Sequence, residues 1–287
     1  MNMPYPPVET VERERWYADW QEDEHASRFD GRSVLPDRML VRNYEAFSDV
    51  RILHKQLQAS GIHRLLEVGC ATGEFHRYLR IRHPEMNYAG VDISRVALER
   101  ARQKYPRGRF FTVDPGLPLR QGLQAAGLPE RWDCVYSKDV IHHQTDPFGF
   151  IGQLLEAASA LLVFRTRTRD QGPTILDPEQ SCQYHYRGWM PYIVLNLRAM
   201  VDEIQRRAPG SEILLYRNRM VLGGEGGRFL PKECYLPETG TAETAVGVFL
   251  ETAQPGRVQV IDRKEMAARY PIGDRILLRL KGRVRRR

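Results

Sequence analysis

The chain has 287 residues, of which 42% are hydrophobic and 28% are charged, an ordinary composition for a soluble globular protein. The formal net charge is +7, but five of these positive charges lie in the last seven residues, KGRVRRR. The rest of the chain is therefore nearly neutral, which argues against a surface for nucleic acid. The basic end, residues 281–287, is either a frayed, solvated terminus or a docking element for RNA, DNA or anionic lipid.

Two further classes are excluded by the distribution of apolar residues and cysteines. No run approaches the roughly 18 consecutive apolar residues of a membrane span, and the first residues show no basic stretch followed by an apolar run. We therefore expect a cytoplasmic protein without a secretory signal. The four cysteines lie far apart with no CxxC pair, which disfavours structural zinc and a disulfide framework. They are Cys70, Cys134, Cys182 and Cys234.

The first part of the chain, residues 1–62, is predicted to form an N-terminal helical cap. Its clearest signal is NYEAFSDVRILHKQL, which has the apolar spacing of an amphipathic helix. Trp16, Tyr17 and Trp20 precede this helix. These aromatic residues belong either to the packed core of the cap or to a lid across a binding site.

Residues 64–168 alternate between short apolar runs and helical patterns. The strand candidates are RLLEVG, NYAGVDI, GRFFTV, WDCVYS and ALLVFRT, and the helices between them are GEFHRYLRIRH, SRVALERARQKY and PFGFIGQLLEAAS. Strands that alternate with helices predict a parallel sheet covered on both faces, with right-handed crossovers. The continuous apolar runs are typical of strands buried on both faces.

Beyond the fifth strand, a long loop leads to a predicted helix, IVLNLRAMVDEIQRR, and to two more strands, EILLYRNRMVL and TAVGVFLET. The fold class is therefore α/β: a Rossmann-like, doubly wound, mostly parallel sheet of seven strands, with N-terminal helices and a C-terminal β extension. We assign residues 63–255 to the core and its inserts, and residues 256–287 to the C-terminal extension with its basic tail.

The segment LLEVGCATGEF joins the first strand to the first helix of the core. Gly69 and Gly73 allow a tight turn and a close approach of the backbone to a ligand. In open parallel sheets, ligands bind at the carboxyl ends of the strands, beside this turn. Asp92 ends the second strand about twenty residues later, where a carboxylate can accept hydrogen bonds from a ribose diol. Together, these features predict a ligand of the adenosine type.

The spacing of the glycines disfavours a nicotinamide dinucleotide. A dinucleotide site has the pattern GxGxxG, but Ala71 occupies the position of its middle glycine. Glu67 lies two residues before Gly69, where it would repel a phosphate and suit a cationic ligand.

These segments, together with VDIS, FTVDPG and WDCVYSKDVIHHQTDP, resemble the class I S-adenosylmethionine-dependent methyltransferases over about residues 60 to 170. The resemblance implies S-adenosylmethionine as the cofactor, with its methionine part near Glu67 and the glycines, and its ribose at Asp92. Asp114 is expected near the adenine, unless it serves only to start the loop before Pro115. The residues expected around the cofactor are Glu67, Gly69, Cys70, Ala71, Gly73, Asp92, Ile93, Asp114, Ser137 and Lys138.

The segment SKDVIHHQTDPFGF follows the fourth strand. Asp146 and Pro147 are typical of a helix start, with Asp as the cap and Pro in the first turn. We predict no metal site, because adjacent side chains tend to diverge and no second cluster supplies further ligands. His142 or His143 is a candidate base for the acceptor's proton. The alternative is that both histidines only pack against the cofactor or bind backbone groups.

A second group of interest, in SCQYHYRGWMPY, follows the fifth strand, where the resembling family commonly builds its acceptor pocket. Its aromatic rings and guanidinium are suited to a small-molecule site, although the same rings would also anchor a long loop. The candidate substrate-binding residues are Tyr184, His185, Tyr186, Arg187 and Trp189.

We therefore predict an enzyme that transfers a methyl group by in-line displacement to a small or medium-sized organic acceptor, such as a natural product, a sugar or a lipid-linked intermediate. SKDV stands after the fourth strand, where methyltransferases that act on the amino groups of nucleic-acid bases carry NPPY or DPPY. The alternatives are a methyltransferase of RNA or protein, and a catalytically inactive cofactor-binding partner. The sequence is also compatible with a homodimer.

Overall fold

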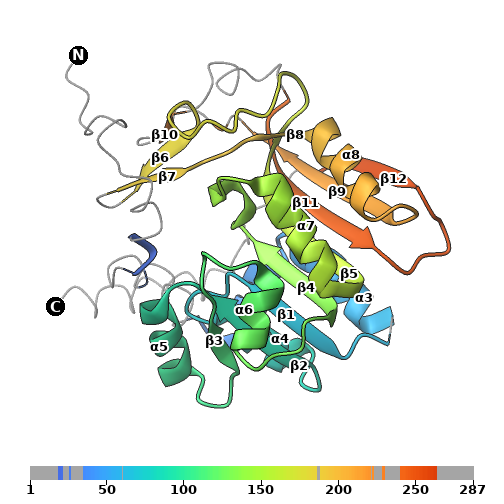
Figure 1. Ribbon diagram of the computed structural model, residues 1–287. Coiled ribbons are helices and arrows are strands. Elements are labelled where there is room, and N and C mark those ends of the chain that lie inside the picture. The colour runs from blue at the N-terminus through green and yellow to red at the C-terminus, as the bar shows by residue number, and fades with distance from the viewer. Residues whose placement is uncertain are drawn as a thin grey trace, which may run out of the picture.

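The structure is a computed structural model that describes residues 19–21, 26, 35–59, 61–185, 188–220, 222, 228–229 and 240–263. The described residues form a nine-stranded central sheet with helices on both faces, and a separate three-stranded sheet above it (Figure 1). Several segments singled out in the sequence lie outside the described residues. They are Trp16, Tyr17, the basic end at 281–287, and most of the insert at 223–239.

The central sheet has the strand order β12-β9-β11-β5-β4-β1-β2-β3, and β8 pairs with β5 beside this path. Only β11 runs antiparallel to its neighbours, β5 and β9, among the pairs of this sheet. Its strands are β1 (Arg64–Val68), β2 (Asn87–Asp92), β3 (Phe110–Thr112), β4 (Trp132–Lys138), β5 (Ala158–Arg169), β8 (Leu195–Asn196), β9 (Glu212–Arg219), β11 (Ala242–Phe249) and β12 (Val258–Asp262).

The predicted doubly wound α/β fold is confirmed, and all seven predicted strands are present. The count of seven is too low, because β8 and β12 were not predicted. Two-residue β8 is too short to leave a sequence pattern, and β12 has no buried position, since its residues alternate between exposed and partly exposed. Since β12 pairs with β9, residues 258–262 belong to the main sheet. The division of the chain at residues 62 and 255 stays a prediction.

Helices cover both faces of the sheet. They are α2 (Asp37–Tyr44), α3 (Ser48–Ala59), α4 (Glu74–Arg82), α5 (Arg95–Lys104), α6 (Leu119–Ala125), α7 (Pro147–Ala157) and α8 (Leu197–Arg207), with the short 3-10 turns η3 (Asp19–Gln21) and η5 (Ile141–His143). No helix among the described residues is long and apolar enough to cross a membrane.

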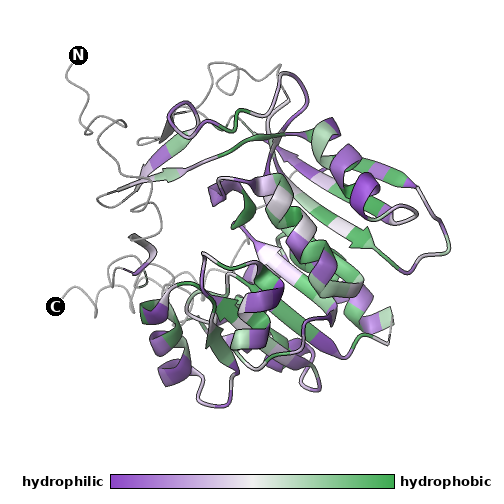
Figure 2. Cartoon of the chain, viewed as in Figure 1, coloured by the Kyte–Doolittle hydropathy of each residue, from purple (hydrophilic) through white to green (hydrophobic). Residues whose placement is uncertain are grey.

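Successive residues of the central strands enter different cores. On β5, Leu162 and Phe164 pack with α6, α7 and α8, whereas Leu161 and Val163 pack with α2, α3 and α4. This alternation follows from the two-residue period of a strand, and burial of both faces explains the continuous apolar runs. Figure 2 shows the hydrophobic residues along the central strands and hydrophilic residues over much of α8.

Two helix starts follow from side-chain caps. The Ser94 hydroxyl accepts a hydrogen bond from the Ala97 amide (3.2 Å), and the Asp146 carboxylate accepts one from the Gly149 amide (2.9 Å). Pro147 occupies the first turn of α7, so the predicted helix start is confirmed. At its other end α7 passes directly into β5 at Ala158, without an intervening turn.

Three other predictions need correction. The helix expected over residues 193–207 begins only at Leu197, because residues 195–196 pair with β5 and Asn196 caps the helix. The N-terminal helix expected over residues 43–57 is broken between Tyr44 and Ser48. The long loop after β5 contains a hairpin, β6 (Cys182–His185) and β7 (Gly188–Pro191), joined by β10 (Arg228–Phe229).

The pH dependence of stability can be tested at His76 on α4. Its buried ring packs against Tyr88, and burial together with the charge of Arg80 lowers its pKa to about 4. Histidine in an unfolded chain titrates near pH 6.5. The folded state therefore binds fewer protons between these values, and stability falls as the pH drops from about 6.5 to about 4.

His76→Phe keeps an aromatic ring but cannot be protonated. We expect the free energy of unfolding of this variant to decrease by about 1–3 kcal/mol less than that of the wild type over this pH range. Urea unfolding at pH 4.5, 5.5, 6.5 and 7.5 measures the slope. His54 and His83 also have lowered pKa values, so some slope should remain in the variant. An unchanged slope would contradict the assignment to His76.

Candidate active site

A cavity of about 660 Å³ lies at the carboxyl ends of β1, β2 and β4. The strand order reverses here, because β1 continues to β2 and β3 on one side and has β4 and β5 on the other. Open α/β sheets bind ligands at this switch point. The loops after the three strands line the cavity, together with Trp20 of η3, Tyr44 of α2, and Gln183 and Met190 of the hairpin.

Two positions in the loop between β1 and α4 require glycine. Gly69 and Gly73 have φ of 84° and 78°, in the left-handed region. A Cβ on Gly69 would lie 2.2 Å from Val140 Cγ2, and one on Gly73 would lie 2.7 Å from the Phe110 ring. Gly69 lines the cavity, whereas Gly73 is the N-cap of α4 and does not.

Asp92 connects this loop to the end of β2. Its Oδ2 accepts a hydrogen bond from the Ala71 amide (2.8 Å), and its Oδ1 accepts one from the Ser94 amide (2.8 Å). A carboxylate has about four acceptor sites, so each oxygen can accept a further hydrogen bond. Burial raises the pKa of Asp92, although the amides of Ser94 and Ala71 act against this effect. The arrangement suits a vicinal diol.

Glu67 is a buried acid at the cavity wall, with 6% of its surface exposed. The Tyr88 hydroxyl donates a hydrogen bond to Glu67 Oε2, and burial raises the pKa of Glu67 to about 8. A cation beside this carboxyl group would favour its ionised form. Glu67, the loop and Asp92 together therefore fit a ligand with a cationic group and a ribose, as S-adenosylmethionine has.

The remaining predicted cofactor residues divide into two groups. Cys70, Ala71, Ile93, Asp114 and Lys138 line the cavity. Asp114 Oδ1 also accepts a hydrogen bond from the Gly116 amide (2.8 Å), a loop-starting role, and its contact with adenine stays a prediction.

Ser137, by contrast, is fully buried away from the cavity wall. Its hydroxyl donates to the Val68 carbonyl (3.0 Å) and so connects β4 to β1.

The two histidines of η5 differ in position. His143 lines the cavity, whereas His142 is buried and is absent from the cavity wall. His143 Nδ1 lies 2.8 Å from the Pro191 carbonyl oxygen. A carbonyl only accepts, so Nδ1 carries the proton, and in the neutral ring Nε2 is the basic nitrogen. The Trp20 ring packs edge-on against His143, with centroids 5.3 Å apart.

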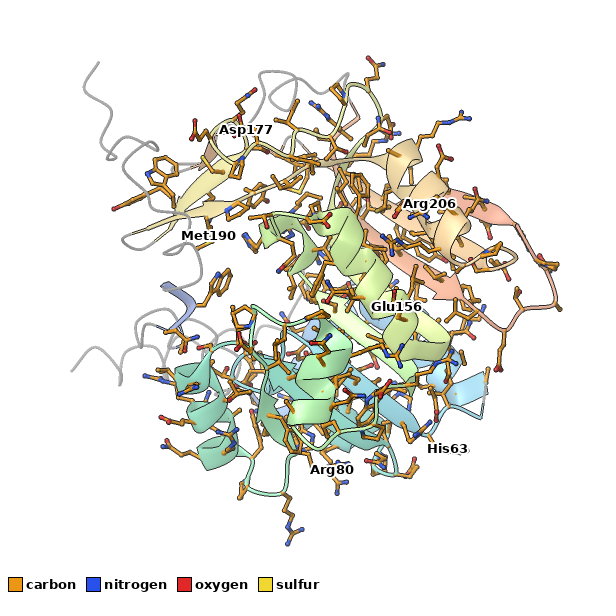
Figure 3. The ribbon with its side chains drawn as sticks, viewed as in Figure 1. His63, Arg80, Glu156, Asp177, Met190 and Arg206 are labelled. Atoms are coloured by element: carbon orange, nitrogen blue, oxygen red, sulfur yellow. The ribbon has the colours of Figure 1, made fainter. Side chains whose placement is uncertain are left out.

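The register of the β6–β7 hairpin decides which of its residues reach the cavity. Gln183 pairs with Met190, and Tyr184 pairs with Trp189. Successive residues of a strand point to opposite faces, so only one of these pairs can face the site. Gln183 and Met190 line the cavity (Met190 is labelled in Figure 3). Tyr184 and Trp189 do not line it and instead form an edge-on ring pair with centroids 5.2 Å apart.

The other predicted acceptor residues lie beyond what the structure describes. Tyr186 and Arg187 are outside the described residues, as is the side chain of His185. Acceptor binding by the group from Tyr184 to Trp189 thus stays a prediction. No cluster of three or more His, Cys, Asp or Glu side chains able to hold a metal ion occurs among the residues searched, which are the described ones.

Several residues that line the cavity were not selected from the sequence. They are Tyr44, Thr72, Ser94, Asp139, Gln144, Thr145, Phe150, Gln153, Gln183 and Met190, among others, whereas Trp20 was already a candidate for a lid across the site. For Gln183 the signal was present: once SCQYHYRGWMP is treated as a hairpin, its two-residue period separates Gln183 from Tyr184.

The family whose description is "Methyltransferase domain" matches residues 37–206. The chain belongs to this family. The predicted class is confirmed: the protein is an S-adenosylmethionine-dependent methyltransferase of class I. No curated protein matches the methyltransferase.

Solved structures of other methyltransferases resemble this fold. The plantazolicin methyltransferase BamL, in complex with S-adenosylhomocysteine (SAH) and a triazolic desmethylPZN analog, is 11% identical, with 82% of this chain and 93% of that chain covered and a TM-score of 0.50. Magnesium protoporphyrin IX methyltransferase from Synechocystis PCC 6803, with bound SAH, is 16% identical, with coverage of 80% and 96% and a TM-score of 0.49. At such identities the likeness concerns the fold alone.

Glu67 is expected to lower the stability of the folded protein while it strengthens binding of the cofactor, because its buried carboxyl group has a raised pKa. The proton on Glu67 stabilises the folded methyltransferase fully below about pH 4.3, and this stability is lost as the pH rises through about 8. We expect Glu67→Gln to raise the free energy of unfolding at pH 8 by about 1–3 kcal/mol relative to the wild type, so that it unfolds at a higher urea concentration. Its affinity for S-adenosylmethionine should fall about tenfold, because a carboxylate beside the cation is lost.

Urea unfolding at pH 5 and pH 8, with calorimetric titration of the cofactor, measures both effects. Glu203→Gln on α8 is the matched control. Hydrogen bonds from Arg206 and Arg207 lower the pKa of Glu203 to about 2, so this change should slightly destabilise the protein and leave cofactor affinity unaltered. A Glu67→Gln protein that is less stable than the wild type at pH 8 would contradict the protonated state.

The glycine turn can be tested with a second matched pair. Gly69→Ala places a Cβ 2.2 Å from Val140, whereas Gly127→Ala, at a similar φ of 69°, meets nothing within 4 Å. We expect Gly127→Ala to cost only about 1 kcal/mol for its left-handed backbone. Gly69→Ala should cost more and lower S-adenosylmethionine affinity at least about tenfold, because the loop must shift. Urea unfolding and calorimetric titration of the cofactor measure both effects. Equal losses of stability and of cofactor affinity in the two variants would contradict the collision at Gly69.

Proposed function

We propose that the methyltransferase transfers a methyl group to a hydroxyl or amino group of a small or medium-sized organic acceptor, with His143 as the general base. The observation that carries the proposal is the hydrogen bond from His143 Nδ1 to the Pro191 carbonyl (2.8 Å) at the cavity wall. This bond directs the basic nitrogen of the ring away from the hairpin backbone. Among the two histidines of η5, only His143 has this position.

S-adenosylmethionine supplies an electrophilic methyl group on a sulfonium. The chain's main contribution to a direct displacement is to hold donor and acceptor in line. Glu67 would bind near the cationic part of the cofactor, and the two oxygens of Asp92 would bind its ribose. The glycine turn at Gly69 lets the backbone approach between them.

His143 would accept the proton that an attacking hydroxyl loses, or the proton that an ammonium group has to lose before its nitrogen can attack. The imidazolium that forms keeps its Nδ1–H bond to Pro191, so the ring does not need to turn during the reaction. Trp20 and Tyr192 pack against the ring, with centroids 5.3 and 5.8 Å from it, and restrict its orientation. General-base catalysis by a positioned group contributes about 10²–10⁴-fold.

The dimensions of the site support a small acceptor. The cavity of about 660 Å³ falls in the range of about 300–1,000 Å³ typical of small-molecule sites, and it has to hold the cofactor as well as the acceptor. Its acceptor side carries Gln144, Thr145 and Gln183 together with Trp20 and Met190, a mixture of polar and apolar groups. Such mixed walls are typical of sites that bind organic ligands by shape and a few hydrogen bonds.

The direct test offers the protein labelled S-adenosylmethionine with a cell extract separated into small-molecule and macromolecular fractions. We expect label in the small-molecule fraction. Label in RNA or protein instead would overturn the proposed acceptor class. Tight binding of SAH with no label in either fraction would support an inactive cofactor-binding partner.

His143→Gln should lower the rate of methyl transfer at saturating acceptor by about 10²–10⁴-fold, because the base is lost. The SAH dissociation constant should change less than threefold. His63→Gln is the control, since His63 is an exposed residue next to the other end of β1 (Figure 3). Initial rates measured with the labelled cofactor and the active small-molecule fraction check this. A His143→Gln protein with the wild-type rate would show that this ring has only a structural role.

A further inference from the structure

Asp139, directly after β4, has a strained backbone. Its φ is 59°, and among the described residues only Ala71 is another non-glycine residue with positive φ. The left-handed conformation costs an L-residue roughly 1–2 kcal/mol and persists where the surroundings hold it. Both residues line the cavity. The left-handed conformation of Ala71 directs its amide to Asp92.

Two buried arginines of β5 hold the Asp139 side chain. Arg167 Nη1 donates to Asp139 Oδ1 (2.9 Å), and Arg165 Nε lies 3.5 Å from the same oxygen. The alternation in RTRTR places both guanidiniums on one face of the strand. The Asp139 side chain is 36% exposed, whereas those of Arg165 and Arg167 are 6% and 9% exposed. The carboxylate is thus anchored from the protein side while it lines the cavity.

Asp139 is not the sole carboxylate that compensates the charges of Arg165 and Arg167 among the described residues. Glu243 of β11 forms an ion pair with Arg165 and another with Arg167 (2.9 Å), and it does not line the cavity. The hydrogen bond from Arg167 ends on Oδ1 of Asp139. Among the described residues, none donates a hydrogen bond to Oδ2. One oxygen of the carboxylate therefore retains its acceptor capacity.

The charge of Asp139 is fixed at neutral pH. Burial acts to raise the pKa of Asp139, but Arg167 and Arg165 outweigh it and hold the pKa well below its usual range. Lys138 also lines the cavity, but its ammonium lies 3.4 Å from the centroid of the Phe47 ring, in a cation–π contact. The cavity wall therefore includes a carboxylate that stays ionised at neutral pH.

Asp139 and the proposed base are parts of one connected structure. Arg167 Nε donates to the Tyr192 hydroxyl (2.9 Å), and the Tyr192 ring packs against His143. The carbonyl of the preceding residue, Pro191, accepts from His143 Nδ1. The residues that hold Asp139 thus also set the orientation of His143, which fixes the carboxylate relative to the base.

We propose that Asp139 binds an O–H or N–H donor of the acceptor, so that the enzyme selects acceptors with a second hydroxyl or an amino group near the methylated atom and rejects carboxylates and phosphates. This assignment rests on the proposed function. A site built to bind a donor discriminates strongly against ligands that lack it, because its polar group is then left unpaired. An anionic ligand would in addition be repelled by the carboxylate.

The test separates the small-molecule fraction of a cell extract by ion exchange into anionic, neutral and cationic pools. Each pool is offered with labelled S-adenosylmethionine to the wild type and to Asp139→Asn. Asparagine has the same shape and tolerates positive φ, so the backbone is retained. Label is expected in the neutral pool for a polyol or in the cationic pool for an amine.

In Asp139→Asn, the amount of the active pool needed for half-maximal rate should rise about 10- to 100-fold, the range for a hydrogen bond to a charged group. The SAH dissociation constant should change less than threefold. Asp262→Asn is the control, because Asp262 forms ion pairs with Arg217 and Arg219 in the same sheet without lining the cavity. It should leave half-saturation unchanged.

Asp139→Glu gives an independent variant in case Asp139→Asn folds poorly. It keeps the charge and can retain the ion pairs but moves the carboxylate by one methylene, so acceptor binding should weaken. The melting temperature should fall somewhat, because Glu tolerates the left-handed backbone less well than Asp. Label in the anionic pool, or unaltered half-saturation in both variants, would overturn the proposal. A wild type that binds SAH but labels no pool would instead refute the proposed methyl transfer, and this assignment with it.

Discussion

The hydrogen bond between the Asp92 carboxylate and the Ala71 amide connects the ends of two parallel strands, and the site depends on it. It holds the turn after β1 beside the end of β2, so that one carboxylate both shapes the loop and faces the cavity. The turn is possible because Gly69 takes a left-handed conformation next to Val140, where a side chain would collide. The positions of Glu67, at the end of β1, and of the cofactor cavity follow from this arrangement.

A second constraint lies at the far end of β5, where the apolar strand changes to RTRTR. Buried guanidiniums are costly unless they are paired, and here Asp139 and Glu243 pair with Arg165 and Arg167. The cluster brings together the segment after β4, strand β11 and, through Tyr192, the hairpin. The positions of His143 and of the hairpin side of the cavity therefore depend partly on Arg165, Arg167 and Glu243, which do not line the cavity.

Two residues of the cavity wall, Glu67 and Asp139, have features that lower the stability of the folded protein. Glu67 is buried with its pKa raised to about 8, and Asp139 has a strained backbone. Each feature costs free energy that the surrounding core must offset. Both residues line the same cavity, which is where such costs are expected if the groups serve a bound ligand.

The sequence by itself determined the parts of this protein that rest on local patterns. The seven strands, the cap at Asp146, the glycine turn and the acid at the end of β2 all follow from spacing and residue type within a few positions, and the resemblance to methyltransferases rests on them. The tertiary structure alone decides that His143 lines the cavity and His142 does not, and that Gln183 and Met190 line it rather than Tyr184 and Trp189. Each choice depends on a contact between segments far apart in the chain, such as the bond from His143 to Pro191 or the register of the hairpin, and the side-chain direction that such contacts set has no counterpart in the local pattern.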